Sequence, residues 1–207
     1  GGKLEKRIAN HHTHELYLDQ KGFLWGTDSD YTEATDLWRN RLWKQSPDGQ
    51  LSDAIPWVEG FEQFGGSNFV VDEMGDVYFP FQNQLYKRTS GGEVSLRSDF
   101  TFGRLCTIAA DGKGNILVSD SHEDGSLYRV GKEGAVELIA GNLKEQNPKN
   151  PPLEEKRFNL FYGITRNETD VYLANSGSRR ILSVKPDGSF SDYFFSETPW
   201  YLLFIYF

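Results

Sequence analysis

The chain has 207 residues, of which 38% are hydrophobic and 14% aromatic, so it can bury a core and is not disordered by composition. Its formal net charge is −8 and its basic residues are scattered, with Arg179 and Arg180 the nearest thing to a basic cluster. This charge pattern excludes a nucleic-acid footprint. A single cysteine, Cys106, excludes an internal disulfide framework. The closing apolar run, 201–207, is far shorter than the ~20 residues that span a bilayer, so no membrane insertion is predicted.

Four segments of the chain share a hydrophobic residue that is followed seven positions later by glycine. They are Leu42–Gly49, Leu85–Gly92, Leu127–Gly134 and Ile181–Gly188, and their glycines lie 43, 42 and 54 residues apart. A period of about 40–50 residues indicates the blades of a propeller or the units of a solenoid.

Each repeat resolves into four predicted strands with turn residues between them. The first strand ends at an acid or amide, and a turn of the form Asp-x-x-Gly follows it in the first three repeats, because Asp bonds its own backbone and Gly accepts a positive φ. The second strand is rich in β-branched and aromatic residues, the third is the signature segment, and the fourth is more polar. The first strands end at Asp19, Asp72, Asp111 and Asn167.

Helical periodicity is not sustained anywhere, and four antiparallel strands per repeat are the geometry of a β-propeller blade. We therefore predict an all-β, single-domain β-propeller over residues 1–207. Its blades are expected at about 11–58, 67–99, 105–141 and 160–196. Residues 1–10 and 199–207 fit strands of a further blade, so five or six blades are expected in the complete protein. Open blade edges would allow self-association.

The segment Leu138–Gly188 resembles an NHL-type repeat, through LIAGN, VYLANSGSRRI and the closing PDG. The third repeat resembles it through VSDSHEDGSLYRVGKEG. This resemblance implies a propeller, a fold that hosts binding modules, scaffolds and several enzymes, so it does not identify an activity.

In a propeller, the loops between second and third strands share one face with the crossings between blades, and ligands bind there. Aromatic side chains on this face suit a sugar, a peptide or another flat apolar ligand, although most of them are expected to pack between blades. The predicted ligand-binding residues are His12, His14, Trp38, Phe64, Phe102, His122, Phe161 and Tyr162.

Two histidines near the start of the first blade could hold a metal. His12 and His14 are separated by one residue and would point to the same side of a strand, next to Glu15. The favoured alternative is that they are surface histidines with ordinary hydrogen bonds, because a third ligand would have to come from another blade. No cofactor is predicted beyond this divalent-metal alternative.

Acidic residues in the first blade suggest a second possible cation site. Asp28, Asp30 and Asp36 have the alternation of a calcium loop, but the glycine and terminal glutamate of that motif are missing. We therefore expect a solvated acidic loop after Asp28. Asp28, Asp120 and Asn175 occupy equivalent positions, which predicts a structural role in capping the loop that follows the second strand.

The sequence lacks several common catalytic motifs: it has no nucleophile elbow, no P-loop and no His-Glu-x-x-His motif. The chain is similar to gluconolactonase-class propellers around VYLANSGSRRI, yet Tyr162 stands at their metal-binding Asn, and only Glu15 is a displaced counterpart of their early Glu. It is also similar to streptogramin-lyase-like propellers, for whose catalytic histidine His122 is a stand-in.

We predict a ligand-binding or protein-interaction scaffold that uses the loop face around the central channel. The expected partner is a protein, a peptide or a carbohydrate. The alternative is a propeller hydrolase or lyase that uses His14, Glu15 or His122 on the same face. The sequence does not identify the cellular compartment of the protein, although it weakly favours an extracytoplasmic (secreted or periplasmic) location.

Overall fold

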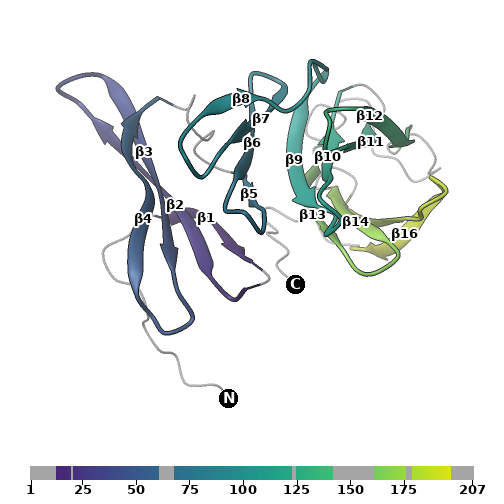
Figure 1. Ribbon diagram of the computed structural model, residues 1–207. Coiled ribbons are helices and arrows are strands. Elements are labelled where there is room, and N and C mark those ends of the chain that lie inside the picture. Colours follow the sequence, from purple (N-terminus) through teal and green to yellow (C-terminus); the bar gives the residue numbers. More distant parts are fainter. Residues whose placement is uncertain are drawn as a thin grey trace. The chain divides into compact units, whose positions relative to one another are not determined.

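The computed structural model describes residues 13–19, 21–60, 68–122, 125–141, 161–175 and 179–196 (Figure 1). These residues form sixteen β-strands and no helix, so this part of the chain contains no membrane-spanning helix. The contacts divide the chain into a first unit, residues 1–69, and a second unit, residues 70–207. The further strands expected at 1–10 and 199–207 lie outside the described residues, and the single-domain assignment stays a prediction.

The first unit contains one blade, an antiparallel sheet whose strands follow one another in sequence order. Its strands are β1 (Thr13–Leu18), β2 (Leu24–Thr32), β3 (Leu37–Gln45) and β4 (Leu51–Glu59).

The second unit contains three blades of the same topology. The second blade is made of β5 (Val70–Val71), β6 (Val77–Phe81), β7 (Gln84–Arg88) and β8 (Val94–Leu96). The third is made of β9 (Leu105–Ala110), β10 (Ile116–Asp120), β11 (Ser126–Val130) and β12 (Val136–Ala140). The fourth is made of β13 (Phe161–Arg166), β14 (Val171–Asn175), β15 (Arg180–Val184) and β16 (Phe190–Phe195). The predicted all-β fold with four four-stranded blades is confirmed.

The side chain that begins the turn between first and second strands accepts two backbone N–H groups in every blade. In the first blade, Asp19 Oδ1 accepts the N–H groups of Lys21 and Phe23, two and four residues ahead, each at 2.9 Å. Asp72 and Asp111 accept the equivalent pairs, whereas Asn167, whose turn is one residue shorter, accepts the N–H groups two and three residues ahead. This local bonding is the reason that the Asp-x-x-Gly pattern marks the turn so clearly.

The signature glycine does more than close the hairpin between third and fourth strands. All four signature glycines have a positive φ, between 82° and 96°, as the turn requires. In the second unit, two of them also touch the preceding blade: a Cβ at Gly134 would lie 2.7 Å from the carbonyl oxygen of Arg97, and one at Gly188 would lie 2.3 Å from that of Ile139. The repeat therefore also encodes close packing between blades.

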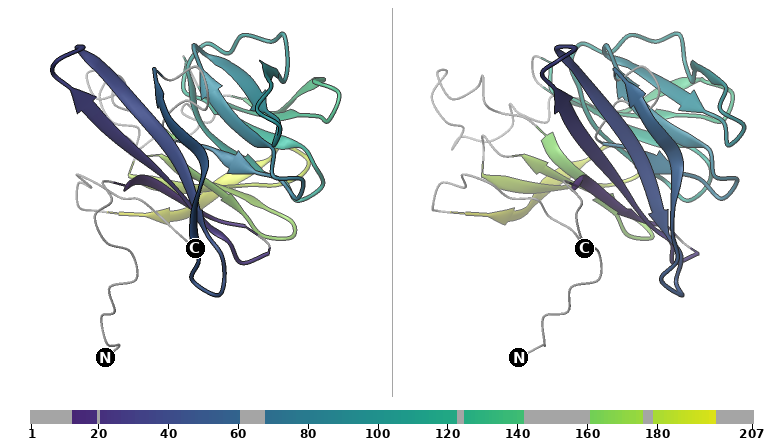
Figure 2. Two further views of the ribbon diagram at one scale, coloured as in Figure 1. Left: turned by 60° about the vertical axis from the view of Figure 1, so that its left-hand side comes forward. Right: turned by 90° about the vertical axis from the view of Figure 1, so that its left-hand side faces the viewer.

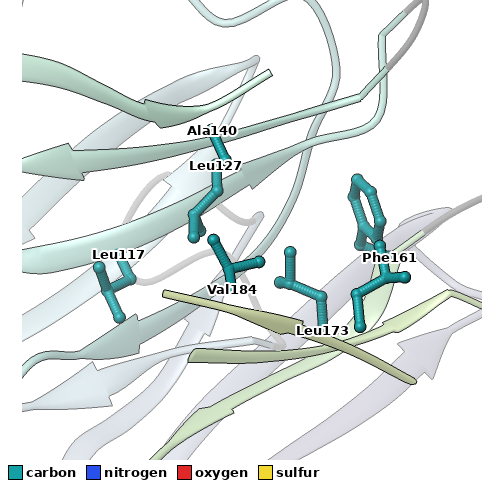
Figure 3. Close-up of a cluster of buried hydrophobic side chains, with 7 residues drawn as sticks. Leu117, Leu127, Ala140, Phe161, Leu173 and Val184 are labelled. Carbon is teal, nitrogen blue, oxygen red and sulfur yellow. The ribbon is translucent and has the colours of Figure 1, made fainter. Parts of the chain in front are cut away.

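A hydrophobic core joins the third and fourth blades (Figure 3). Leucines from the middle strands of both blades meet there, and Phe161 of β13 closes the cluster towards the loop end. Cys106 of β9 is partly buried against the same cluster. The cluster comprises Leu117, Leu127, Ala140, Phe161, Leu173, Leu182 and Val184.

The prediction of a solvated acidic loop after Asp28 is wrong, because the inserted residues lengthen the β2–β3 hairpin. These strands, purple and dark blue in Figure 2, have nine residues each. Arg39 pairs with Asp30 at 2.6 Å, and the rings of Tyr31 and Trp38 lie 5.4 Å apart across the strands. Cross-strand pairs of opposite charge and of aromatic rings stabilise a ladder, so this polar sequence continues as sheet.

Candidate functional site

Asp120, at the end of β10, organises the loop end of the third blade. Its Oδ2 accepts the N–H of Gly103 at 2.8 Å, and its Oδ1 accepts the N–H groups of Arg104 at 2.7 Å and His122 at 2.8 Å. One buried carboxylate thus holds both the crossing that enters the blade and the loop that follows β10. The capping role predicted for this position is confirmed for Asp120.

Two further hydrogen bonds tie this loop end to the neighbouring blades of the second unit. The N–H of Phe102 donates to the carbonyl oxygen of Asn83 at 2.9 Å, which links the third blade to the second. The N–H of Phe161 donates to Oγ of Ser121 at 3.0 Å, which links the fourth blade to the third. These two hydrogen bonds therefore connect the loop ends of all three blades.

His122 and Tyr162 are exposed on this frame, and each follows one partner of the Ser121–Phe161 hydrogen bond. Tyr162 is 56% exposed. His122 packs over Gly103, where an added Cβ would lie 2.5 Å from the Cβ of His122, so the histidine needs a glycine beneath it. We call these two residues the His122–Tyr162 site.

Tyr162 owes its position to a β-bulge. Phe161 pairs with Asn175 and Gly163 with Ala174, which leaves Tyr162 between them without a cross-strand partner. Equivalent bulges occur in β9 and β1, where Cys106 and His14 stand between paired residues. Bulges re-aim a side chain and are frequent beside functional sites.

A sequence signal for these bulges exists in the repeat. Each bulged residue, His14, Cys106 or Tyr162, stands five positions before the acid or amide that begins the first turn of its blade. Superimposing the repeats on that residue would have placed the three positions together, although it would not have shown that they bulge.

The structure places two of the predicted binding residues inside the protein. Phe102 is buried in an aromatic cluster, with its ring 4.9 Å from that of Phe100 and 5.5 Å from that of Tyr128. Phe161 belongs to the core between the third and fourth blades. Packing, which the sequence predicts for most aromatic side chains on this face, accounts for both.

The remaining predicted residues belong to the first unit. Trp38 is 46% exposed on the lengthened hairpin, and its ring lies beside that of Tyr31. The pKa of this neighbouring tyrosine is raised by a hydrogen bond to Asp36, together with desolvation. His12, Phe64 and the side chain of His14 lie outside the described residues. Burial raises the pKa of Glu15.

Asp28, the counterpart of Asp120 in the first blade, is a buried structural carboxylate. Its Oδ1 accepts hydrogen bonds from Thr13 Oγ1 and Trp43 Nε1, each at 2.9 Å. Its Oδ2 lies 2.9 Å from Nε and 2.8 Å from Nη2 of Arg41. Both oxygens are therefore committed to the protein's own donors.

Within the part of the chain that the structure describes, no group of three or more His, Cys, Asp or Glu side chains could hold a metal ion. The metal site considered as an alternative at His12, His14 and Glu15 falls partly outside that part, and nothing tests it.

No protein-family model and no curated protein matches the chain. Among solved structures, it is similar to a streptogramin B lyase, with 17% identity and a TM-score of 0.59 over 93% of this chain and 57% of that one. It is similar to a chain of a nidogen–laminin complex, with 13% identity and a TM-score of 0.60 over 87% and 64%. It is also similar to virginiamycin B lyase from Staphylococcus aureus, with 11% identity and a TM-score of 0.55 over 90% and 71%.

The chain spans less than two thirds of the length of the first two of these structures. At such low identity the likeness is one of fold, and this fold is shared by lyases and by a protein found in a complex with another protein. The chain has the β-propeller fold of these proteins, as its repeat predicts.

Proposed function

We propose that the chain is a ligand-binding or protein-interaction scaffold, and that the His122–Tyr162 site contributes to its contact surface. The observation that carries this proposal is the Asp120 carboxylate, which binds three backbone N–H groups around the site. A loop that is already held in shape loses little conformational entropy when a partner binds, so its contacts contribute more fully to affinity.

The chemistry of the two side chains suits a partner with both apolar and polar surface. Tyrosine and histidine each offer a flat ring with a polar edge, which is suited to a peptide or a carbohydrate. The propeller in the nidogen–laminin complex makes a protein partner a compatible choice.

A propeller enzyme is the second candidate, favoured by the fold shared with two lyases and by the exposure of His122. A histidine side chain can donate a proton to a bound substrate or accept one from it. A lactonase-like hydrolysis is the other reaction that this alternative includes.

The test compares four proteins on peptide and glycan arrays: the parent chain, His122→Ala, Tyr162→Ala and the control Met74→Ala. Met74 is exposed in the turn that follows β5, at the opposite end of the blade from the loop end. We expect the parent and Met74→Ala to bind the same probe, and Tyr162→Ala to lose at least tenfold in affinity.

Absence of binding by the parent chain to any probe would remove the scaffold proposal. Turnover of a cyclic depsipeptide or a lactone by the parent chain, abolished in His122→Ala, would replace it by the enzyme.

A further inference from the structure

The loop end of the fourth blade holds a buried arginine with donors that are not used. Arg180, the first residue of β15, is 4% exposed. Its Nε and Nη2 atoms have no hydrogen-bond partner among the described residues. Buried cationic donors without a partner are strongly destabilising, so such a group requires an explanation, such as an ion or ligand that binds there.

The first blade shows what this position normally holds. Arg41 stands directly opposite Asp28 in the β2–β3 ladder, and Arg180 stands directly opposite Asn175 in the β14–β15 ladder. In the first blade, Nε and Nη2 of Arg41 both bind Oδ2 of Asp28, at 2.9 Å and 2.8 Å. The two atoms that bind a carboxylate in Arg41 are the same two atoms that lack a partner in Arg180.

The other neighbours of the two arginines match. An aspartate of the fourth strand lies 3.6 Å from each guanidinium, although at different atoms: Asp53 lies beside Nη1 of Arg41, and Asp192 lies beside Nε of Arg180. An aromatic ring of the fourth strand also lies under each, with Trp57 at 4.9 Å from Arg41 and Phe195 at 5.7 Å from Arg180. The replacement of an aspartate by Asn175 is therefore the main difference between the two sites.

Asp192 does not fill the gap that this replacement leaves. At 3.6 Å its oxygen is beyond hydrogen-bond distance from Nε of Arg180, and its side chain is 37% exposed, so solvent weakens the attraction. Arg179, whose guanidinium lies 5.6 Å from the ring of Phe195, adds a second positive charge at the same loop end.

We propose that Arg180 binds the carboxylate of a ligand through Nε and Nη2, the two atoms by which Arg41 binds Asp28 in the first blade. A carboxylate fits this edge of a guanidinium better than a phosphate does, because the equivalent space in the first blade accommodates an aspartate side chain. The ligand is thus a small carboxylic acid, or a carboxylate carried by a larger ligand. The Arg180 site uses different residues and a different chemistry from the His122–Tyr162 site, so either proposal can fail without the other.

The experiment follows the Nε–Hε signal of Arg180 by NMR during a titration with acetate at constant ionic strength, with chloride as the balancing ion. The signal is assigned by its loss in Arg180→Met. We expect a saturable shift in the parent chain and in the control Met74→Ala. Inorganic phosphate should bind more weakly than acetate.

Asn175→Asp is the decisive variant, because it supplies the carboxylate from within the chain. It should move the Arg180 signal towards the acetate-bound position without any ligand, and weaken acetate binding by about tenfold or more. Acetate should also raise the melting temperature of the parent chain, and should leave that of Asn175→Asp unchanged.

Three results would overturn the proposal: no saturable shift of the Arg180 signal in the folded parent chain, tighter binding of phosphate than of acetate, or an undiminished acetate response in Asn175→Asp. If Arg180→Met does not fold, the comparison between the parent chain and Asn175→Asp still decides the question. Circular dichroism on every variant confirms that the fold is kept.

Discussion

The first and fourth blades share the same four-stranded topology. The buried aspartate that faces an arginine in the first blade is replaced by an asparagine in the fourth. Both have the signature glycine with positive φ, and both place an arginine opposite the equivalent residue of the second strand, which is Asp28 in the first blade and Asn175 in the fourth. In the first blade Asp28 neutralises that arginine, and in the fourth Asn175 does not. The repeat therefore keeps the strand order and the signature turn, while side-chain chemistry at the loop end varies from blade to blade.

The largest effect on stability is expected at the signature glycine of the fourth blade, which touches the backbone of the preceding blade, whereas that of the first blade has no described atom near it. Gly188→Ala should lower the free energy of unfolding by about 3 kcal/mol or more, since it combines an unfavourable positive φ with a Cβ 2.3 Å from the carbonyl oxygen of Ile139. Gly49→Ala should cost only about 1–2 kcal/mol, because no described atom lies within 4 Å of its added Cβ. Urea unfolding measures both, and equal losses would show that the turn alone requires the glycine.

The next effect makes the first blade resemble the fourth. Asp28→Asn removes the charge that neutralises Arg41, and it weakens the hydrogen bonds from Thr13 and Trp43. We expect a loss of about 2–3 kcal/mol in the free energy of unfolding. The control is Asp30→Asn, whose partner Arg39 is half exposed, and which should cost less than about 1 kcal/mol. Similar losses in the two variants would contradict the distinction between buried and exposed pairs.

The reverse substitution should have the opposite sign. Asn175→Asp gives Arg180 a charged partner and should raise the free energy of unfolding by about 1 kcal/mol at neutral pH. The arginine would lower the folded-state pKa of the introduced carboxyl, so the gain is present above its unfolded pKa and disappears as the pH falls through its folded pKa. A destabilised variant at pH 7 would show that the space does not accommodate a carboxylate.

The smallest effect on stability concerns the ion pair of Asp170 with Lys185, which lies just before β14 and just after β15 in the fourth blade. The hydrogen bond from Lys185 lowers the pKa of Asp170, and Asp170 raises the pKa of Lys185. The contribution of Asp170 to stability is therefore present above its unfolded pKa, and it is lost as the pH falls through its folded pKa. Lys185→Met should flatten the acid limb of a melting-temperature profile below about pH 4.

The second blade holds the matched pair, Lys87 and Asp76. Lys87→Met should flatten the same limb. An unchanged profile in both variants would mean that neither pair contributes to the acid sensitivity of the fold.

Much of the fold could be predicted because its signals are local. An aspartate that binds N–H groups two and four residues ahead leaves a clear mark in the sequence, and so does a glycine with positive φ. The repeat of these marks gave the number of blades and the position of each turn. The capping role of Asp120 followed from its recurrence in equivalent positions.

The site was predicted less well, because exposure depends on contacts between distant residues. The sequence places Phe102 and Phe161 in crossings between blades that suit binding, but Phe161 begins β13 and packing against neighbouring residues buries both rings. The lengthened β2–β3 hairpin was missed because its acidic residues resemble a loop until Arg39 and Trp38 are placed opposite them. The bulge at Tyr162 depends on the pairing of two strands, and single-strand patterns do not show it.

The sequence by itself determined the blades, because turns and strand alternation depend on residues a few positions apart. Only the tertiary structure showed which charges are buried and which donors lack partners, because these depend on side chains brought together across strands. In the sequence, Arg180 is one of two adjacent basic residues. In the folded blade it occupies the position of Arg41 without the carboxylate that Arg41 binds.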